Sequence, residues 1–133
     1  MRHLSCTLAV ASLLIGCGLV EKHHLTGHYY LVAEDVPEQM KVIYNLEPGD
    51  RLSRHRIPET VFAVGWDRRY IVAKQHPQNN RSITNYYYLD TARDSEDADP
   101  TASIVGPLTE PAFSRKKVDL GLPDFRRTIK SLE

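Results

Sequence analysis

Short runs of β-branched and aromatic residues, separated by turn residues, follow one another along the chain from Tyr29 onward. Runs of this length and composition are typical of β-strands, and they predict strands over 29–33, 41–46, 61–66, 70–75, 86–89 and 103–105. The sequence Asp67-Arg68-Arg69 separates two of these runs and predicts a hairpin loop. The acidic stretch 90–100 predicts the connection of a second hairpin, formed by the last two runs.

The spacing of apolar residues changes after 106–108. Thr109 can cap a short helix, which Gly121 can end. Asp124 can cap a second helix, whose apolar residues recur at i, i+4 and i+7, namely Phe125, Ile129 and Leu132. Strand–helix–strand alternation is missing from this pattern. It therefore predicts a single α+β domain over 28–133, an antiparallel β-meander of about five to six strands with one or two short C-terminal helices.

The first sixteen residues have a different pattern, which is typical of an export signal. A positively charged start, 1–3, precedes the uncharged run 4–15. As a helix, this run would span about 18 Å, which is too short for a hydrocarbon core of about 30 Å. A charged start, a short apolar run and small residues predict a signal peptide over 1–16.

The end of this signal, Leu14-Ile15-Gly16-Cys17, resembles a bacterial lipobox. The resemblance implies cleavage before Cys17 and a diacylglycerol attached to the sulfur of Cys17, with N-acylation of that residue. The alternatives are an uncleaved anchor or an ordinary signal with a chance cysteine, and an ordinary signal would need a small residue where Leu14 stands. Residues 17–27 are then expected to be a lipidated tether.

The residue that follows the lipobox cysteine bears on the location of such lipoproteins. Asp at this position marks retention in the inner membrane of enteric-type bacteria, and here the residue is Gly18. We therefore expect a protein anchored in the outer membrane of a bacterial cell envelope, facing the periplasm or the cell surface.

Composition and charge narrow the classes of function. The chain has 133 residues with 17 basic and 17 acidic side chains, so it lacks the broad basic field of a general nucleic-acid binder. Its two cysteines are Cys6, within the signal, and Cys17, which lipid would cap. A mature chain processed in this way could use neither a disulfide nor a cysteine nucleophile.

Three segments of the mature chain resemble a family of small bacterial lipoproteins of unknown function. They are Ile71 to Gln75, Tyr86 to Asp90 and Val105 to Phe113, and the resemblance extends over about 70–122. It implies no activity and no catalytic residues.

Two clusters could hold a metal ion. The first contains His23, His24 and His28, but it lacks a third ligand if the segment is extended, so a solvated tether is the preferred interpretation. The second cluster is acidic and does not fit the EF-hand pattern, which favours a loop between two strands. It comprises Asp90, Asp94, Glu96, Asp97 and Asp99. We expect no metal and no cofactor.

A basic cluster and an aromatic cluster are candidate binding surfaces. The basic cluster could contact phosphate groups, lipid A or an acidic protein, or could be a solvated edge strand. It contains Arg51, Arg54, His55 and Arg56, with Arg68 and Arg69 as possible neighbours.

The aromatic cluster comprises Tyr86, Tyr87, Tyr88, Trp66 and Phe62. Because side chains alternate along a strand, Tyr87 must face away from Tyr86 and Tyr88. One side of this strand is then either an exposed aromatic surface or covered by the C-terminal helices or a loop.

The chain carries no familiar catalytic motif. The chain contains no Gly-x-Ser-x-Gly, no His-Glu-x-x-His and no glycine-rich phosphate loop. We therefore expect a binding or structural module for an envelope protein or surface glycan, with no enzymatic activity and no nucleic-acid partner. The alternative is an inhibitor or immunity lipoprotein that uses the basic cluster to block an acidic active site.

Overall fold

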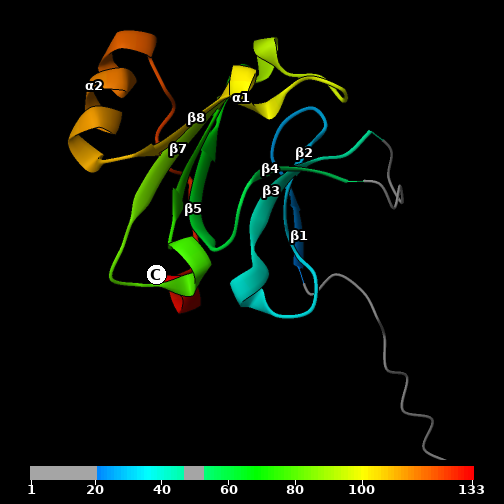
Figure 1. The fold of residues 1–133 in the computed structure, drawn as a ribbon, viewed down its shortest axis with the longest axis vertical. Coiled ribbons are helices and arrows are strands. Elements are labelled where there is room, and N and C mark those ends of the chain that lie inside the picture. Colours follow the sequence, from blue (N-terminus) through cyan, green and yellow to red (C-terminus); the bar gives the residue numbers. More distant parts are fainter. Residues whose placement is uncertain (1–20, 47–52) are drawn as a thin grey trace, which may run out of the picture.

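The computed structural model describes residues 21–46 and 53–133, and these form two antiparallel sheets (Figure 1). Sheet A has the order β1-β2-β3-β4, with bounds Glu21–His24, Tyr29–Ala33, Lys41–Tyr44 and Arg54–Ile57. Sheet B has the order β8-β7-β6-β5-β9, with bounds Ile104–Leu108, Asn85–Asp90, Tyr70–Gln75, Val61–Trp66 and Arg127–Thr128. The predicted meander is therefore divided between two sheets, and the α+β class is confirmed.

Strand β1 corrects the predicted tether, 17–27, in the part that the structure describes, since residues 21–24 form a strand. Its residues pair with β2 from Glu21 opposite Ala33 to His24 opposite Tyr30. The turn between the two strands uses Gly27 at a positive φ of 53°. The composition Glu-Lys-His-His conceals the strand, because its stability comes from pairing with the apolar strand β2 and not from its own side chains.

Both predicted hairpins are confirmed in sheet B. Strands β5 and β6 have the predicted bounds, and the Asp67 carboxylate closes their loop by accepting the backbone N–H groups of Arg69 and Tyr70 at 2.8 and 2.6 Å. Strand β7 pairs with β8 across the acidic segment. That segment folds into a 3-10 turn, Thr91–Arg93, and one turn of helix, α1, Pro100–Ser103.

The helix predicted after Thr109 is confirmed as α2, Glu110–Leu120. Thr109 Oγ1 accepts the backbone N–H of Ala112, and Gly121 ends the helix in the left-handed conformation with φ 66°. Two further 3-10 turns, Pro37–Gln39 and Pro77–Asn79, lie in loops. In the part of the chain that the structure describes, no helix is long and apolar enough to cross a membrane.

The second predicted helix, beginning at Asp124, is wrong. Residues 127–128 instead form β9 along the free edge of β5. The backbone N–H groups of Arg126 and Ile129 donate to the carbonyls of Val64 and Phe62 at 2.8 and 2.7 Å. An open strand edge offers these bonds directly, which outweighs a weak helical period. Leu132 is still buried, in the final 3-10 turn Lys130–Leu132.

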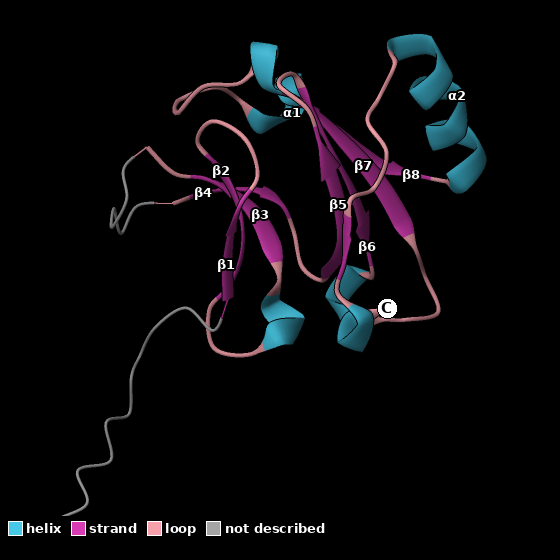
Figure 2. Ribbon diagram, turned by 180° about the vertical axis from the view of Figure 1, so that it is seen from behind, coloured by secondary structure: helices cyan, strands magenta, loops and turns pink. Residues whose placement is uncertain are grey.

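Two apolar clusters account for the packing. The larger lies between the sheets and contains Leu31, Val42 and Ile57 from sheet A with Val64, Ile71 and Leu89 from sheet B. The smaller lies on the opposite face of sheet B, under α2, and contains Tyr70, Val72, Tyr86, Tyr88, Phe113 and Leu122. Figure 2 shows α2 on the side of sheet B that is remote from sheet A. Sheet B is therefore covered on both faces.

Candidate functional site

The three consecutive tyrosines do not form an exposed surface. Tyr87 faces the core between the sheets, whereas Tyr86 and Tyr88 face α2, as their alternation predicts. Each is at most 9% exposed, and burial raises the pKa of all three hydroxyls. Close packing explains the glycine opposite them, because a Cβ at Gly106 would overlap the Tyr87 ring. Of the two alternatives that the sequence leaves open for this strand, the covered face is the one observed, since Phe113 of α2 packs with Tyr86 and Tyr88.

The other aromatic residues of that cluster are also engaged within the protein. Phe62 is buried in the core between the sheets. Trp66 is half-buried at the end of β5, where the guanidinium of Arg126 lies over its ring at 4.4 Å from the centroid. A cation over an indole face stabilises both groups. Trp66 therefore does not join the tyrosines in one surface.

The basic cluster is not a surface patch either, because Arg56 is buried. Its Nε lies 2.7 Å from Asp94 Oδ2, and the two side chains are 2% and 0% exposed. Arg54, on the same strand, is half-exposed and lies 4.0 Å from Glu96. Arg51 lies outside the described residues. Alternation places Arg54 and Arg56 on the same face of β4, and the acidic segment covers that face over Arg56 but leaves Arg54, at the start of the strand, half-exposed.

The buried pair joins the two halves of the molecule. Tyr29, from sheet A, donates its hydroxyl to Asp94 Oδ2 at 2.8 Å. Arg56 also donates from Nη2 to the carbonyl of Ser95 at 2.9 Å. Burial, and then the hydrogen bond to Asp94, raise the pKa of Tyr29. Three side chains thus fix the acidic segment between β7 and α1 onto sheet A. We call them the Asp94 cluster.

The residues of the two clusters considered as metal sites make other contacts in the structure. His23 bonds to Glu21 at 2.8 Å and His24 to the carbonyl of Gly27 at 2.8 Å, both in or beside a strand, so no helical face forms. In the acidic segment, Asp99 caps α1. Across residues 21–46 and 53–133, no three side chains of His, Cys, Asp or Glu are grouped as metal ligands.

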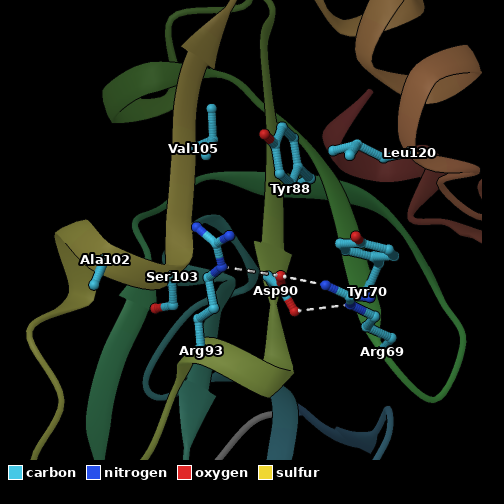
Figure 3. A pocket seen from close by; sticks show the side chains of 9 residues that line it. All are labelled: Arg69, Tyr70, Tyr88, Asp90, Arg93, Ala102, Ser103, Val105 and Leu120. Carbon is cyan, nitrogen blue, oxygen red and sulfur yellow. Dashed lines mark hydrogen bonds and ion pairs between the residues drawn. The ribbon is translucent and has the colours of Figure 1, made fainter.

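A pocket lies beside this segment, on the outer face of sheet B. Its volume is about 140 Å³, and the start of β6, the end of β7, the start of β8, α1 and the end of α2 enclose it. We call it the arginine pocket (Figure 3). Its lining residues are Arg69, Tyr70, Tyr88, Asp90, Arg93, Ala102, Ser103, Val105 and Leu120.

The centre of the arginine pocket is one carboxylate between two guanidinium groups. Arg69 donates from Nε and Nη2 to the two oxygens of Asp90 at 3.3 and 3.2 Å. Arg93 approaches the same carboxylate from the other side, with Nε 3.6 Å from Oδ2. Figure 3 shows Asp90 between the two arginines. The backbone N–H of Ala92 donates to Asp90 Oδ1 at 3.1 Å. The lining therefore carries one more positive charge than negative.

The two arginines remain accessible although they are paired. Their side chains are 58% and 73% exposed, against 10% for the carboxylate of Asp90. Arg69 also lies over the ring of Tyr70, 5.0 Å from its centroid, and its bonds to Asp90 raise its pKa. A fixed fork of N–H donors is the geometry that binds carboxylate or phosphate oxygens.

Sequence reasoning found only part of this site. Arg69 was considered as a neighbour of the basic cluster, and Arg93 was not singled out. Two signals in the sequence pointed to this site. Arg93 follows Asp90 by three positions at the end of a strand. The strand pairing also sets Tyr70 opposite Asp90, which brings the preceding residue, Arg69, close to that carboxylate. Three residues of the predicted clusters line this pocket, each from a different cluster: Arg69, Tyr88 and Asp90.

Comparison with known proteins assigns a family. The family described as "Protein of unknown function (DUF3997)" matches residues 26–127, which include both sheets except β1 and part of β9. No curated protein and no solved structure matches the chain. The matched range includes all three segments that carry the sequence resemblance. The resemblance to a family of unknown function is therefore confirmed. The chain belongs to this family of proteins of unknown function.

Proposed function

We propose that this chain is a lipid-anchored protein of the bacterial cell envelope that acts by binding, with the arginine pocket as its binding site. The partner is an envelope protein or a surface glycan that presents a carboxylate or a phosphate group. The anchor is a lipid on Cys17, supported by the lipobox at 14–17. Gly18 favours the outer membrane, facing the periplasm or the cell surface.

One observation carries the binding part of this proposal, namely that two exposed arginines share a single carboxylate at a formed pocket. One carboxylate cannot satisfy the hydrogen-bonding capacity of two guanidinium groups, because each group has five donors. An incoming anion can bond to the donors that Asp90 leaves free. The backbone N–H of Ala92 and the contact of Arg69 with Tyr70 hold the site in shape beforehand.

The proposal is for binding and not for catalysis. Asp90 is the one carboxylate among the lining residues, and it is engaged by both arginines and a backbone N–H. It therefore serves to position Arg69 and Arg93. The inhibitor hypothesis uses the basic residues of 51–56 to block an acidic active site, and the burial of Arg56 removes one of them.

The anchor is tested by labelling cells with radioactive palmitate. Wild type should incorporate label and Cys17→Ser should not, because the serine oxygen is not a substrate for thioether formation. A Cys6→Ser variant is the matched control and should label like wild type. Equal labelling of all three variants would contradict the anchor.

The pocket is tested by crosslinking in intact cells and capture of the full-length chain from membranes. Arg69→Gln/Arg93→Gln should reduce the captured partner at least about tenfold, since both charged donors are lost. Arg115→Gln/Lys116→Gln removes the same charge from the exposed face of α2 and should capture normally. Protease treatment before capture distinguishes a protein partner from a glycan. Unchanged capture by the first double variant would contradict the proposed site.

A further inference from the structure

The arginine pocket has an apolar wall beside its charged centre. Three side chains form this wall, from β7, β8 and the end of α2, namely Tyr88, Val105 and Leu120. Figure 3 shows them along one side of the pocket, with Arg69 and Arg93 along the other. Val105 packs against the apolar cluster that contains Tyr88. A ligand in this pocket therefore meets guanidinium groups on one side and apolar side chains on the other.

The protein leaves part of this apolar wall open to solvent. Leu120 is 39% exposed, and Val105 is half-buried. Within residues 21–46 and 53–133, the exposed large apolar side chains are Val36, Ile83, Val118 and Leu120, and of these Leu120 alone lines the arginine pocket. Removing apolar surface from water is favourable, so a ligand gains affinity if it places an apolar group against Leu120.

The guanidinium of Arg93 has free donors on the side of this wall. Its Nε lies 3.6 Å from Asp90 Oδ2, which is too long for a hydrogen bond, and within 21–46 and 53–133 its Nη1 and Nη2 have no acceptor. Figure 3 shows these two nitrogens turned from Asp90 toward the side where Val105 and Tyr88 lie. Burial raises the pKa of the Tyr88 hydroxyl, and the charge of Arg93 opposes this rise. Two N–H groups at the end of a guanidinium match the two oxygens of a carboxylate.

The charge balance of the lining favours a carboxylate over a phosphate monoester. Arg69 and Arg93 carry two positive charges, and Asp90 carries the one negative charge among the lining residues. A carboxylate therefore neutralises the pocket. A phosphate monoester has a charge of about −1.5 to −2 at neutral pH, so it would leave excess negative charge beside Asp90.

The size of the pocket indicates that it encloses the end of a larger molecule. Its volume of about 140 Å³ is well below the roughly 300–1,000 Å³ of sites that enclose a whole small molecule. The last residue of a polypeptide carries a carboxylate and a side chain on the same carbon atom. Such an end group can contact the arginines and the apolar wall together, whereas the acidic group of a sugar is attached to a ring that presents hydroxyl groups.

We infer that the arginine pocket binds the C-terminal carboxylate of a polypeptide whose last residue has a small apolar side chain, such as alanine. This inference rests on the proposed function of the same pocket and names the group that the partner presents. The carboxylate bonds to Arg93, with Arg69 as the second cation, and the side chain of the last residue covers Leu120. Asp90 holds Arg69 in position through the two hydrogen bonds that it accepts.

The experiment is an NMR titration of the purified full-length chain, followed through its backbone amide resonances. The probe is N-acetyl-L-alanyl-L-alanine, and we expect it to shift the resonances of Ala92 and Leu120 saturably. Its C-terminal amide lacks the charge and should bind at least about tenfold more weakly. N-acetyl-L-alanyl-glycine lacks the terminal methyl group and should bind about threefold more weakly. Methyl phosphate tests the other anion class and should bind more weakly than the alanine peptide.

Variants of the pocket separate its charged side from its apolar side. Arg93→Gln should weaken binding of the alanine peptide at least about tenfold. Leu120→Asn should retain binding of the carboxylate but abolish the preference for alanine over glycine at the last position. The matched control is Val118→Asn, which alters an 84% exposed side chain of the same helix outside the pocket and should bind like wild type.

The contrary outcomes distinguish this inference from the proposed function. The inference is overturned if the C-terminal amide binds as well as the free acid, or if Leu120→Asn still prefers alanine over glycine. It is also overturned if methyl phosphate binds and the alanine peptide does not, but the pocket would then still be an anion site, as the proposed function requires. If none of the probes binds at Ala92 and Leu120, both the inference and the proposed site fail.

Discussion

Two aspartates of one acidic segment, Asp90 and Asp94, both pair with arginine but under opposite conditions. Arg56 and Asp94 are almost completely buried, and Tyr29 completes the coordination of one carboxylate oxygen. Arg69 and Arg93 remain largely exposed around Asp90, at the mouth of a pocket. The two pairings use the same residue types and differ in burial. The buried pair connects parts of the protein, whereas the exposed arginines are accessible to a partner.

The physical reason is the environment of each charge. A buried ion pair is stable only while both partners are present, because either one alone would be an uncompensated charge at low dielectric. An exposed pair is solvated and contributes little to stability, so its arginines can exchange partners without unfolding the protein. The Asp94 cluster is thus expected to control stability, and the arginine pocket is expected to control binding.

The strongest test of this contrast is Arg56→Met. Removing the guanidinium leaves Asp94 charged and buried, so we expect a loss of about 3–5 kcal/mol in the free energy of unfolding. Urea denaturation measures it. The control is Arg54→Met on the same strand, where the side chain is 40% exposed and 4.0 Å from its partner. A loss equal to that of the control would mean that the buried pair is not essential.

Replacing both members of the pair sharpens this result. The double variant Arg56→Met/Asp94→Leu removes the orphaned charge, so it should recover much of the stability lost by Arg56→Met alone. A double variant as unstable as the single one would show that the pair acts through packing and not through charge.

A smaller effect is expected for Tyr29→Phe, which removes one donor to Asp94. A loss of about 1–2 kcal/mol is expected at neutral pH, since a hydrogen bond to a charged group is removed from a buried site. Unfolding free energies by urea titration supply the value. A matched variant, Tyr30→Phe, alters the half-buried neighbour on the same strand and should change stability little.

The same tyrosine predicts alkaline sensitivity. Its pKa is raised in the folded state above its ordinary value of 10.0, so the folded protein retains this proton longer than the unfolded chain does. The stability it contributes is therefore complete below about pH 10 and decreases as the pH rises further. Thermal unfolding of wild type should show this decline between neutral and alkaline pH. In Tyr29→Phe the decline should be shallower, and an identical slope would contradict the assignment.

The smallest effect on stability is expected for Arg93→Gln. Its side chain is 73% exposed, so the melting temperature should change by no more than about 3 °C. Differential scanning calorimetry measures this change. Capture of the proposed partner should nevertheless decrease. A large drop in melting temperature would mean that Arg93 contributes to stability as the Asp94 cluster does, which would contradict the contrast between the two sites.

Sequence patterns predicted the elements whose stability is local. The hairpin over 61–75 and the helix after Thr109 were correct because turn and cap residues close them within a few positions. The alternation of the tyrosines was also correct, since it follows from strand geometry alone. The sequence did not indicate whether the face of β7 that carries Tyr86 and Tyr88 is covered. In the structure, Phe113 and Leu122 pack on that face.

Elements that depend on distant partners were missed. Strand β1 is polar and becomes a strand by pairing with β2, and β9 forms because β5 has a free edge. Arg56 was assigned to a surface because its partner, Asp94, is 38 positions away in the chain. In the arginine pocket, Arg69 likewise meets Asp90 through the β6–β7 register, whereas Arg93 lies only three positions from Asp90 in the chain.

The apolar cluster between the sheets has a consequence for how the protein comes apart. Leu31 and Val42 from one sheet share it with Ile71 and Leu89 from the other, and the backbone N–H of Val61 donates to the Met40 carbonyl at 2.8 Å. Separating the sheets would expose the apolar faces of both at once. The described residues should therefore unfold as one cooperative unit, so that a fragment ending at residue 58 would not yield a stable sheet A.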